Sequence, residues 1–276
     1  MSALRGKAAL VTGASSGIGE ALALELARRG ARVALAARRA DRLEQLAGEI
    51  RARGGEALAL AADVTRDGDL ERAVASTVER FGRLDVAVAN AGFGVAARLE
   101  KLTLDDYRRQ LETNVFGVLR TVYAALPELK KTRGTLAVMG SVAGHVAGAG
   151  TSAYCMSKFA VRGLASSLRA ELARDGVAVV LLSPGFVDSD IRRTDNAGVV
   201  HADAPDPMPR WLRMPADVAA RAMARAIAAR RREAVITGHG KVAVFLQRFS
   251  PGLVSWLSTK AMRGRPEPKR VHRCQV

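Results

Sequence analysis

The chain has 276 residues, of which 49% are hydrophobic, enough to bury the core of one large domain or two small ones. It carries 43 Lys and Arg residues against 27 Asp and Glu residues, which gives a net charge of +16. The arginines are spread along the chain and aromatic residues make up only 4%, too few for a base-stacking surface, so we expect no nucleic-acid partner.

Cysteine usage and hydropathy bear on the compartment. The two cysteines, Cys155 and Cys274, imply no disulfide framework and fit a reducing environment. The apolar run after Lys7 is too short for the core of a signal peptide, and no stretch approaches the roughly 20 apolar residues that span a bilayer. We therefore expect a cytoplasmic protein. No cluster of His, Cys and Asp has the spacing of metal ligands, so we expect no metal site.

Short apolar runs alternate with longer helical stretches through residues 1–240. This alternation predicts an α/β protein: a single-domain, doubly wound Rossmann fold with a seven-stranded parallel sheet and helices on both faces. Strands are predicted over residues 8–12, 32–37, 57–61, 84–89, 135–140, 177–182 and 234–237. Helices are predicted over residues 18–29, 41–53, 66–81, 104–126, 151–174 and 216–231, with Pro127 ending the fourth.

The first predicted strand leads directly into a glycine-rich turn at residues 12–19, and a helix follows. The glycines of this turn, Gly13, Gly17 and Gly19, differ in spacing from the commoner G-x-G-x-x-G pattern. The physical principle is the same, because glycines let the backbone approach a pyrophosphate and the N-terminus of the next helix offers unpaired N–H groups. The turn therefore predicts a dinucleotide site.

The end of the second strand bears on which dinucleotide is bound. Sites for NAD usually place an acidic residue about 20 residues beyond the glycines, where it holds the ribose hydroxyls. Here Ala37 stands near that position, and Arg38 and Arg39 follow it with guanidinium groups that pair well with a 2′-phosphate. We predict NADP(H) rather than NAD, with Arg38 a better candidate than Arg39. Two alternatives stay open: both arginines could be solvated, or Asp41 could hold the ribose.

Tyr154 and Lys158 lie four residues apart in a predicted helix, so their side chains share one face. A nearby ammonium favours the phenolate, so we expect Lys158 to lower the pKa of Tyr154 towards the range useful for proton transfer. The same pair occurs by chance on many solvated helix faces. The motif therefore gains weight only together with the rest of the chain.

Taken together, these motifs resemble those of the short-chain dehydrogenase/reductase family over residues 5–240. The resemblance implies a catalytic set of Asn114, Ser141, Tyr154 and Lys158. Tyr154 would supply the proton to a carbonyl oxygen and Ser141 a hydrogen bond that positions this oxygen. Lys158 would tune Tyr154 and, by resemblance, contact the nicotinamide ribose, while Asn114 would relay protons through water.

The resemblance also gives roles to segments that follow the strands. Asp63 and Val64 would lie beside the adenine, the segment 90–92 behind the cofactor, and Val187 against the nicotinamide carboxamide. With the turn and the arginines, the expected cofactor-binding set is Gly13, Ser15, Ser16, Gly17, Ile18, Gly19, Arg38, Arg39, Asp63, Val64, Asn90, Ala91, Gly92, Tyr154, Lys158, Pro184, Gly185, Val187 and Ser189.

The chain departs from the family pattern at two motif positions, and the first, at Cys155 and Met156, should matter to packing more than to chemistry. Cys155 and Met156 stand where the family has smaller residues, and we expect Cys155 to be buried and inert. Ser189 replaces the common threonine and keeps the hydroxyl.

The predicted function is hydride transfer between NADP(H) and a carbonyl or secondary alcohol, with Tyr154 as acid and base. Phe93, Phe186 and Trp211 near the expected cleft favour an apolar substrate. Two alternatives remain: a cofactor-binding scaffold or regulator without turnover, and a membrane-peripheral reductase of lipid-type or steroid-type ketones. We expect a homodimer or homotetramer.

Three features outside the motifs leave questions of substrate and partner open. Residues 188–214, rich in proline, are expected to form a mobile lid. His145 follows Ser141 and could border the substrate, although an exposed loop histidine is the favoured interpretation. Residues 241–276 are expected to form a basic, amphipathic helical extension that packs on the cleft or on another subunit, or contacts an anionic membrane, with disorder as the remaining alternative.

Overall fold

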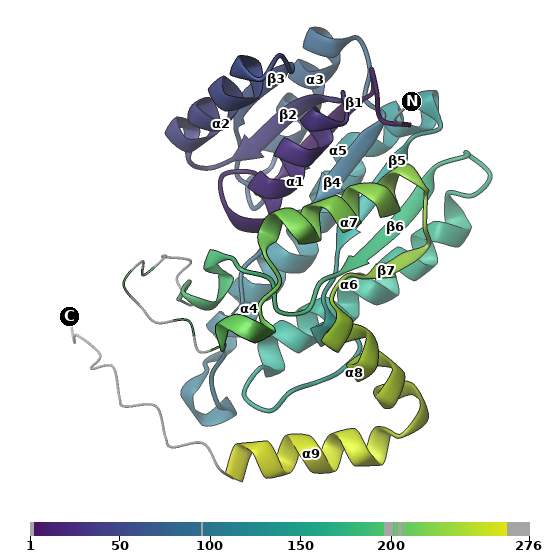
Figure 1. Ribbon diagram of the computed structural model, residues 1–276. Helices are drawn as coiled ribbons and strands as arrows, with labels where there is room; N and C mark the ends of the chain where they lie inside the picture. The colour runs from purple at the N-terminus through teal and green to yellow at the C-terminus, as the bar shows by residue number, and fades with distance from the viewer. Residues whose placement is uncertain are drawn as a thin grey trace.

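The computed structural model describes residues 3–94, 96–195, 201, 203, 206 and 208–263. Its centre is a seven-stranded sheet in the order β3-β2-β1-β4-β5-β6-β7, and all neighbouring strands run parallel (Figure 1). The predicted doubly wound α/β fold is confirmed. The strands are β1 (Ala8–Thr12), β2 (Arg32–Ala37), β3 (Ala57–Ala61), β4 (Val86–Ala89), β5 (Thr135–Met139), β6 (Ala178–Ser183) and β7 (Glu233–Val235).

Helices cover both faces of this sheet and bury its five central strands, while the edge strands β3 and β7 are only partly buried. The helices are α1 (Gly17–Arg28), α2 (Ala40–Ala52), α3 (Asp69–Phe81), α4 (Leu104–Leu111), α5 (Gly117–Thr132), α6 (Ser152–Glu171), α7 (Ala216–Ala228), α8 (Gly238–Phe249) and α9 (Pro251–Arg263). Helices α1, α2 and α7 pack on one face, and α3, α5 and α6 on the other (Figure 1). Because both faces of the central strands are buried, these strands are largely continuous apolar runs, as is typical of parallel sheets.

The order of the strands places a crevice at one edge of the sheet. The chain builds β1, β2 and β3 in one direction and then returns to place β4 on the other side of β1. The connections at the carboxyl ends of β1 and β4 therefore diverge to opposite faces, which is where ligands bind in open parallel sheets. The glycine-rich turn follows β1, and the segment 90–92 follows β4.

The helix predicted over residues 104–126 is longer and less regular than expected. It consists of α4, a π-helical turn at Glu112–Phe116, and α5, which continues through Pro127 to Thr132. The prediction that Pro127 ends the helix is wrong. Proline removes one backbone hydrogen bond, but continuing the helix buries Leu129 and lets the Thr132 hydroxyl donate to Leu84 O at 2.8 Å.

As far as residue 263, the last one described, the predicted C-terminal extension forms two helices, and α8 begins at Gly238, just ahead of the expected boundary at residue 240. The Thr237 hydroxyl caps α8 by accepting a hydrogen bond from Gly240 N at 3.3 Å. Pro251 begins α9, a position where its missing N–H costs no helical hydrogen bond.

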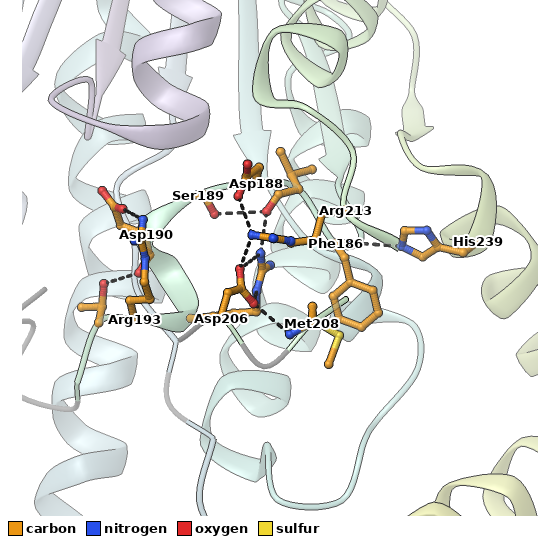
Figure 2. Close-up of polar contacts among 12 residues, drawn as sticks. Phe186, Asp188, Ser189, Asp190, Arg193, Asp206, Met208, Arg213 and His239 are labelled. Atoms are coloured by element: carbon orange, nitrogen blue, oxygen red, sulfur yellow. Dashed lines mark hydrogen bonds and ion pairs between the residues drawn. The ribbon is translucent and has the colours of Figure 1, made fainter. Parts of the chain in front are cut away.

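His239 attaches α8 to the turn that follows β6 (Figure 2). Its Nε2 accepts a hydrogen bond from Phe186 N at 3.0 Å, and the two rings stack with centroids 5.2 Å apart. A Cβ on Gly185 would lie 2.5 Å from the same nitrogen, so this approach requires glycine. The acceptor role needs a neutral imidazole, and burial lowers the pKa of His239 below its usual 6.5.

Acidification is expected to weaken this attachment. Because the folded protein holds His239 with a lowered pKa, the unfolded chain takes up the proton first as the pH falls. The contribution of His239 to the free energy of unfolding is therefore complete above pH 6.5 and is lost as the pH falls through the lowered folded-state pKa. Denaturant titrations across this range should show the wild type losing more stability than His239→Gln, which keeps an acceptor and does not titrate. Parallel stability curves for the two proteins would contradict this role.

Candidate active site

A cleft of about 590 Å³ lies at the carboxyl ends of the strands and brings together most of the predicted cofactor-binding residues. Those that line it are Gly13, Ser15, Ser16, Gly17, Ile18, Gly19, Arg38, Arg39, Asp63, Val64, Asn90, Ala91, Gly92, Tyr154, Lys158, Pro184 and Ser189. Among the described residues, four predicted positions lie outside the lining: Asn114, Ser141, Gly185 and Val187. The structure adds lining residues that no motif indicated, including Arg109, Glu112, Thr113, Ile191 and Thr194.

The glycine-rich turn presents bare backbone to the cleft. Gly13 has a φ of +65°, and a Cβ at this position would lie 2.7 Å from Ala91 Cα. A Cβ on Gly19 would collide with Gly13 O. Ser16 precedes α1 without capping it through its side chain, so the first N–H groups of α1 are left to a ligand. The turn therefore fits a pyrophosphate in shape and in polarity.

Asn90 holds this turn against the end of β4. Its Nδ2 donates to Thr12 O at 2.8 Å, and the Thr12 hydroxyl accepts from Asn90 N at 3.0 Å and from Ala91 N at 3.2 Å. The same hydroxyl donates to Val88 O at 3.2 Å. Asn90 therefore ties the glycine-rich turn to the end of β4, and its place behind a cofactor stays a prediction.

The two arginines after β2 differ in their contacts. Arg39 donates to the hydroxyls of Ser15 and Ser16, at 3.0 and 2.8 Å, and so closes over the glycine-rich turn. Arg38 is exposed and lines the same cleft. Asp41, the alternative ribose acceptor, is not among the described residues that line it. The preference for Arg38 over Arg39 stays a prediction.

The segment after β3 is shaped by local hydrogen bonds. Asp63 Oδ1 accepts from the Thr65 backbone N at 2.9 Å and from its hydroxyl at 2.8 Å. Val64 is buried against α5, where a Cβ on Gly117 would lie 2.7 Å from Val64 Cγ2. The segment therefore offers the cleft a polar edge beside an apolar surface.

Tyr154 and Lys158 lie together on α6, and both line the cleft. The Lys158 ammonium donates to Met139 O at 2.8 Å and lies 5.8 Å from the centroid of the Tyr154 ring. Burial lowers the pKa of Lys158 to about 8. Burial also raises the pKa of Tyr154, against a hydrogen bond with Ser141 that lowers it. The expected lowering of the Tyr154 pKa is therefore wrong in this structure, because desolvation outweighs the favourable contacts.

Ser141 lies at the end of β5, one hydrogen bond away from the phenol. Its hydroxyl also accepts from Ala143 N at 3.1 Å and donates to Pro184 O at 3.4 Å. These contacts tie the end of β5 to the turn after β6.

Asn114 is buried in the π-helical turn, and its side-chain amide forms hydrogen bonds with other groups of the protein. Its Nδ2 donates to Phe93 O at 2.9 Å and to the Ser157 hydroxyl at 3.1 Å, and its Oδ1 accepts from Phe93 N at 3.1 Å. The Ser157 hydroxyl in turn donates to Tyr154 O at 2.7 Å. The side chain thus joins the cleft wall to the Tyr154 helix, and its role in a water relay stays a prediction.

His145 is neither an exposed loop histidine nor a cleft residue among those described. It is buried, with Nε2 3.2 Å from the Ser183 hydroxyl and 2.8 Å from Glu233 Oε1. The interpretation of His145 as an exposed loop histidine is wrong, because Glu233 on β7 gives the buried ring a partner. The contact lowers the pKa of Glu233. The interpretation that His145 borders the substrate stays a prediction.

The predicted lid is tied down at its ends (Figure 2). Val187 and Met214 form a parallel bridge, and Asp206 joins Arg192, at 2.6 Å, to Arg213, at 3.2 Å. The hydrogen bond from Arg192 is the main reason why the pKa of Asp206 falls to about 2. Pro205 and Pro207 lie outside the described residues, and the mobility of the lid stays a prediction.

The two remaining expectations about this region have different outcomes. Cys155 is buried, as expected. Of the three aromatic residues expected near the cleft, Phe93 lines it, whereas Trp211 is 83% exposed. Phe186 stacks on His239 instead.

Comparison with known sequences places the chain among oxidoreductases. A family model described as short chain dehydrogenase matches residues 7–199. An uncharacterized oxidoreductase of Myxococcus xanthus is 40% identical over 192 residues, which cover 69% of this chain and 76% of that protein. An 11-beta-hydroxysteroid dehydrogenase A of Arachis hypogaea is 38% identical over 190 residues, 68% of this chain and 54% of that longer protein.

Solved structures agree with this placement. An alcohol dehydrogenase from the archaeon Thermococcus sibiricus, complexed with 5-hydroxy-NADP, has a TM-score of 0.72 and 33% identity and covers 83% of this chain and 95% of its own. A short chain dehydrogenase/reductase from Burkholderia phymatum, in complex with NAD, has a TM-score of 0.82 and 25% identity and covers 92% of this chain and 96% of its own. The chain belongs to the short-chain dehydrogenase/reductase family of oxidoreductases, and the two structural neighbours above are complexes with nicotinamide nucleotides.

Proposed function

We propose that the protein is an NADP(H)-dependent reductase or dehydrogenase that acts on a carbonyl or a secondary alcohol. The observation that carries the proposal is a single cleft that joins the glycine-rich turn to Tyr154 and Lys158. Arg38 and Arg39, which follow β2, also line this cleft. Ala37 stands at the position where an acidic residue would select NAD. The complex of the Thermococcus protein with 5-hydroxy-NADP supports this choice, while the NAD complex of the Burkholderia protein supports the alternative.

The chemistry follows from the polar groups around the phenol. A bound nicotinamide would supply or accept the hydride. Tyr154 donates a proton to the carbonyl oxygen on which negative charge develops, and its raised pKa keeps it protonated at neutral pH. Ser141 orients this oxygen, and the Lys158 ammonium stabilises the phenolate that remains. The dehydrogenase direction uses the same groups in reverse.

An apolar substrate and a homodimer or homotetramer belong to the same proposal. Phe93 contributes an aromatic surface to the cleft, and the hydroxysteroid dehydrogenase relative acts, by its name, on a bulky apolar substrate class. Self-association is supported by exposed apolar side chains on α4, the π-helical turn, α5 and α6. These are Leu104, Phe116, Tyr123, Met156 and Phe159.

Titration with NADPH tests the cofactor site. Gly19→Ala should abolish the NADPH fluorescence change, because its Cβ would collide with Gly13 O and displace the phosphate cradle. Gly48→Ala is the matched control, since its Cβ would meet nothing within 4 Å on α2, and it should bind as the wild type does. Failure of the wild type itself to bind either NADPH or NADH would overturn the proposed function.

The arginines are expected to select the 2′-phosphate. Arg38→Ala or Arg39→Ala should each raise the Kd for NADPH about tenfold or more, because a charge-assisted contact with phosphate is lost. The Kd for NADH, measured in parallel, should change far less. Equal weakening of both cofactors by the two substitutions would show that neither side chain reads the phosphate.

Removing the phenol should remove the chemistry while leaving the cofactor site in place. Tyr154→Phe is expected to lower kcat on a panel of apolar ketones about a hundredfold to ten-thousandfold, the usual contribution of a positioned acid. Tyr123→Phe, at an exposed position of α5, is the matched control. Unchanged turnover in Tyr154→Phe would contradict the assignment, and NADPH binding without turnover in the wild type would favour a scaffold.

The lowered pKa of the buried Lys158 predicts that cofactor affinity decreases at alkaline pH. The Lys158 ammonium is present below a pKa of about 8 and is lost as the pH rises through that value. The affinity for NADPH should therefore fall above that pH in the wild type. Lys158→Met should bind weakly at every pH, without this decrease. If the affinity of Lys158→Met for NADPH fell equally at alkaline pH, a group other than Lys158 would be responsible for the pH dependence.

A further inference from the structure

The outer side of the C-terminal helices α8 and α9 is an exposed apolar surface. Its members recur at helical spacing and are between 46% and 65% exposed. They are Val242, Phe245, Phe249, Leu253, Trp256 and Leu257, and we refer to this set as the tail surface. Two large aromatic residues on α8, Phe245 and Phe249, contact each other with ring centroids 4.7 Å apart. The sequence alternative in which these residues pack on the cleft of the same chain does not match this exposure.

The two helices stand at the edge of the molecule, with α9 set apart from the sheet and joined to the body through α8 (Figure 1). The inner side of α8 is partly buried, including Leu246, and His239 at its start holds the turn after β6. The tail surface therefore faces away from the sheet, and the contacts of α8 hold it to the rest of the protein.

The Lys, Arg, Asp and Glu residues within α8 and α9 are all basic. Lys241 and Arg248 flank the apolar stripe of α8, and Lys260 follows that of α9. Arg248 lies 5.8 Å from the centroid of the Phe249 ring, and Lys260 lies 5.0 Å from that of Trp256. The sequence has no acidic residue between Glu233 and Glu267. Apolar side chains with a tryptophan, bordered by lysine and arginine, match the boundary between acyl chains and anionic headgroups.

We propose that the tail surface docks on an anionic lipid bilayer. The apolar side chains enter the interfacial region while the cations pair with lipid phosphates, so the protein lies on the membrane face. Within the described residues, no helix combines the length and apolarity needed to cross a bilayer. A second copy of the chain is a poorer occupant, because symmetric pairing of this surface with itself would bring like charges together. The inference does not depend on the proposed reaction.

Vesicle co-sedimentation of the full chain tests the proposal. The protein should sediment with vesicles of equal parts phosphatidylglycerol and phosphatidylcholine and remain in solution with phosphatidylcholine alone. Raising the salt concentration should weaken binding, since the attraction is screened. Replacing Lys241, Arg248 and Lys260 together by Gln should weaken binding about tenfold or more, because each cation near an anionic surface contributes to attachment. Equal sedimentation with both lipids, or with neither, would overturn the proposal.

The two tryptophans of the chain provide a matched spectroscopic test. Trp211→Phe leaves Trp256 as the sole tryptophan, and its emission should shift to the blue when anionic vesicles are added. Trp256→Phe leaves Trp211, which is 83% exposed in the lid and should report no shift. A blue shift of Trp256 that depends on protein concentration and needs no lipid would assign the surface to self-association instead. A shift at Trp211 alone would place any membrane contact elsewhere on the molecule.

Discussion

Hydrogen bonds and a short backbone segment connect the glycine-rich turn to α6, and the geometry of the cleft depends on this connection. Asn90 joins the ends of β1 and β4 through Thr12. The segment after Asn90 reaches Phe93, whose N–H and carbonyl are both held by the buried amide of Asn114. Asn114 then contacts Ser157, one turn from Tyr154 on α6. A shift at either end would therefore move the phosphate cradle relative to the phenol.

Burial of Lys158 and desolvation of the half-buried Tyr154 set the electrostatics of this part of the cleft. The Lys158 ammonium has a carbonyl partner, Met139 O, and no carboxylate partner among the ion pairs of the described residues. Desolvation therefore destabilises its charged form and the charged form of Tyr154 alike, so the pKa of Lys158 falls to about 8 while the pKa of Tyr154 rises. A ligand whose oxygen atoms accept hydrogen bonds from the Lys158 ammonium would stabilise its charged form. The nicotinamide ribose expected from the family resemblance has that chemistry.

The features that the sequence predicted well are local in origin. The parallel sheet is predicted by the alternation of apolar runs with helical stretches. The phosphate-binding turn is predicted by the spacing of three glycines within residues 12–19. Features that depend on tertiary partners were missed or misread. His239 meets Phe186 across 53 residues, His145 is buried because β7 supplies Glu233, and α5 continues past Pro127 because Leu129 fits the core. The Tyr154 pKa depends on burial, which helix spacing alone does not report.

The central claim, that this cleft carries out hydride transfer, is tested most directly by isotope transfer. NADPH carrying deuterium at the transferable position of the nicotinamide would be incubated with the protein and an apolar ketone that it reduces, and the alcohol analysed by mass spectrometry and NMR. We expect one deuterium on the carbinol carbon, delivered to a single face, and none in the solvent. An alcohol without deuterium, or with the label on both faces equally, would contradict direct transfer within an ordered site.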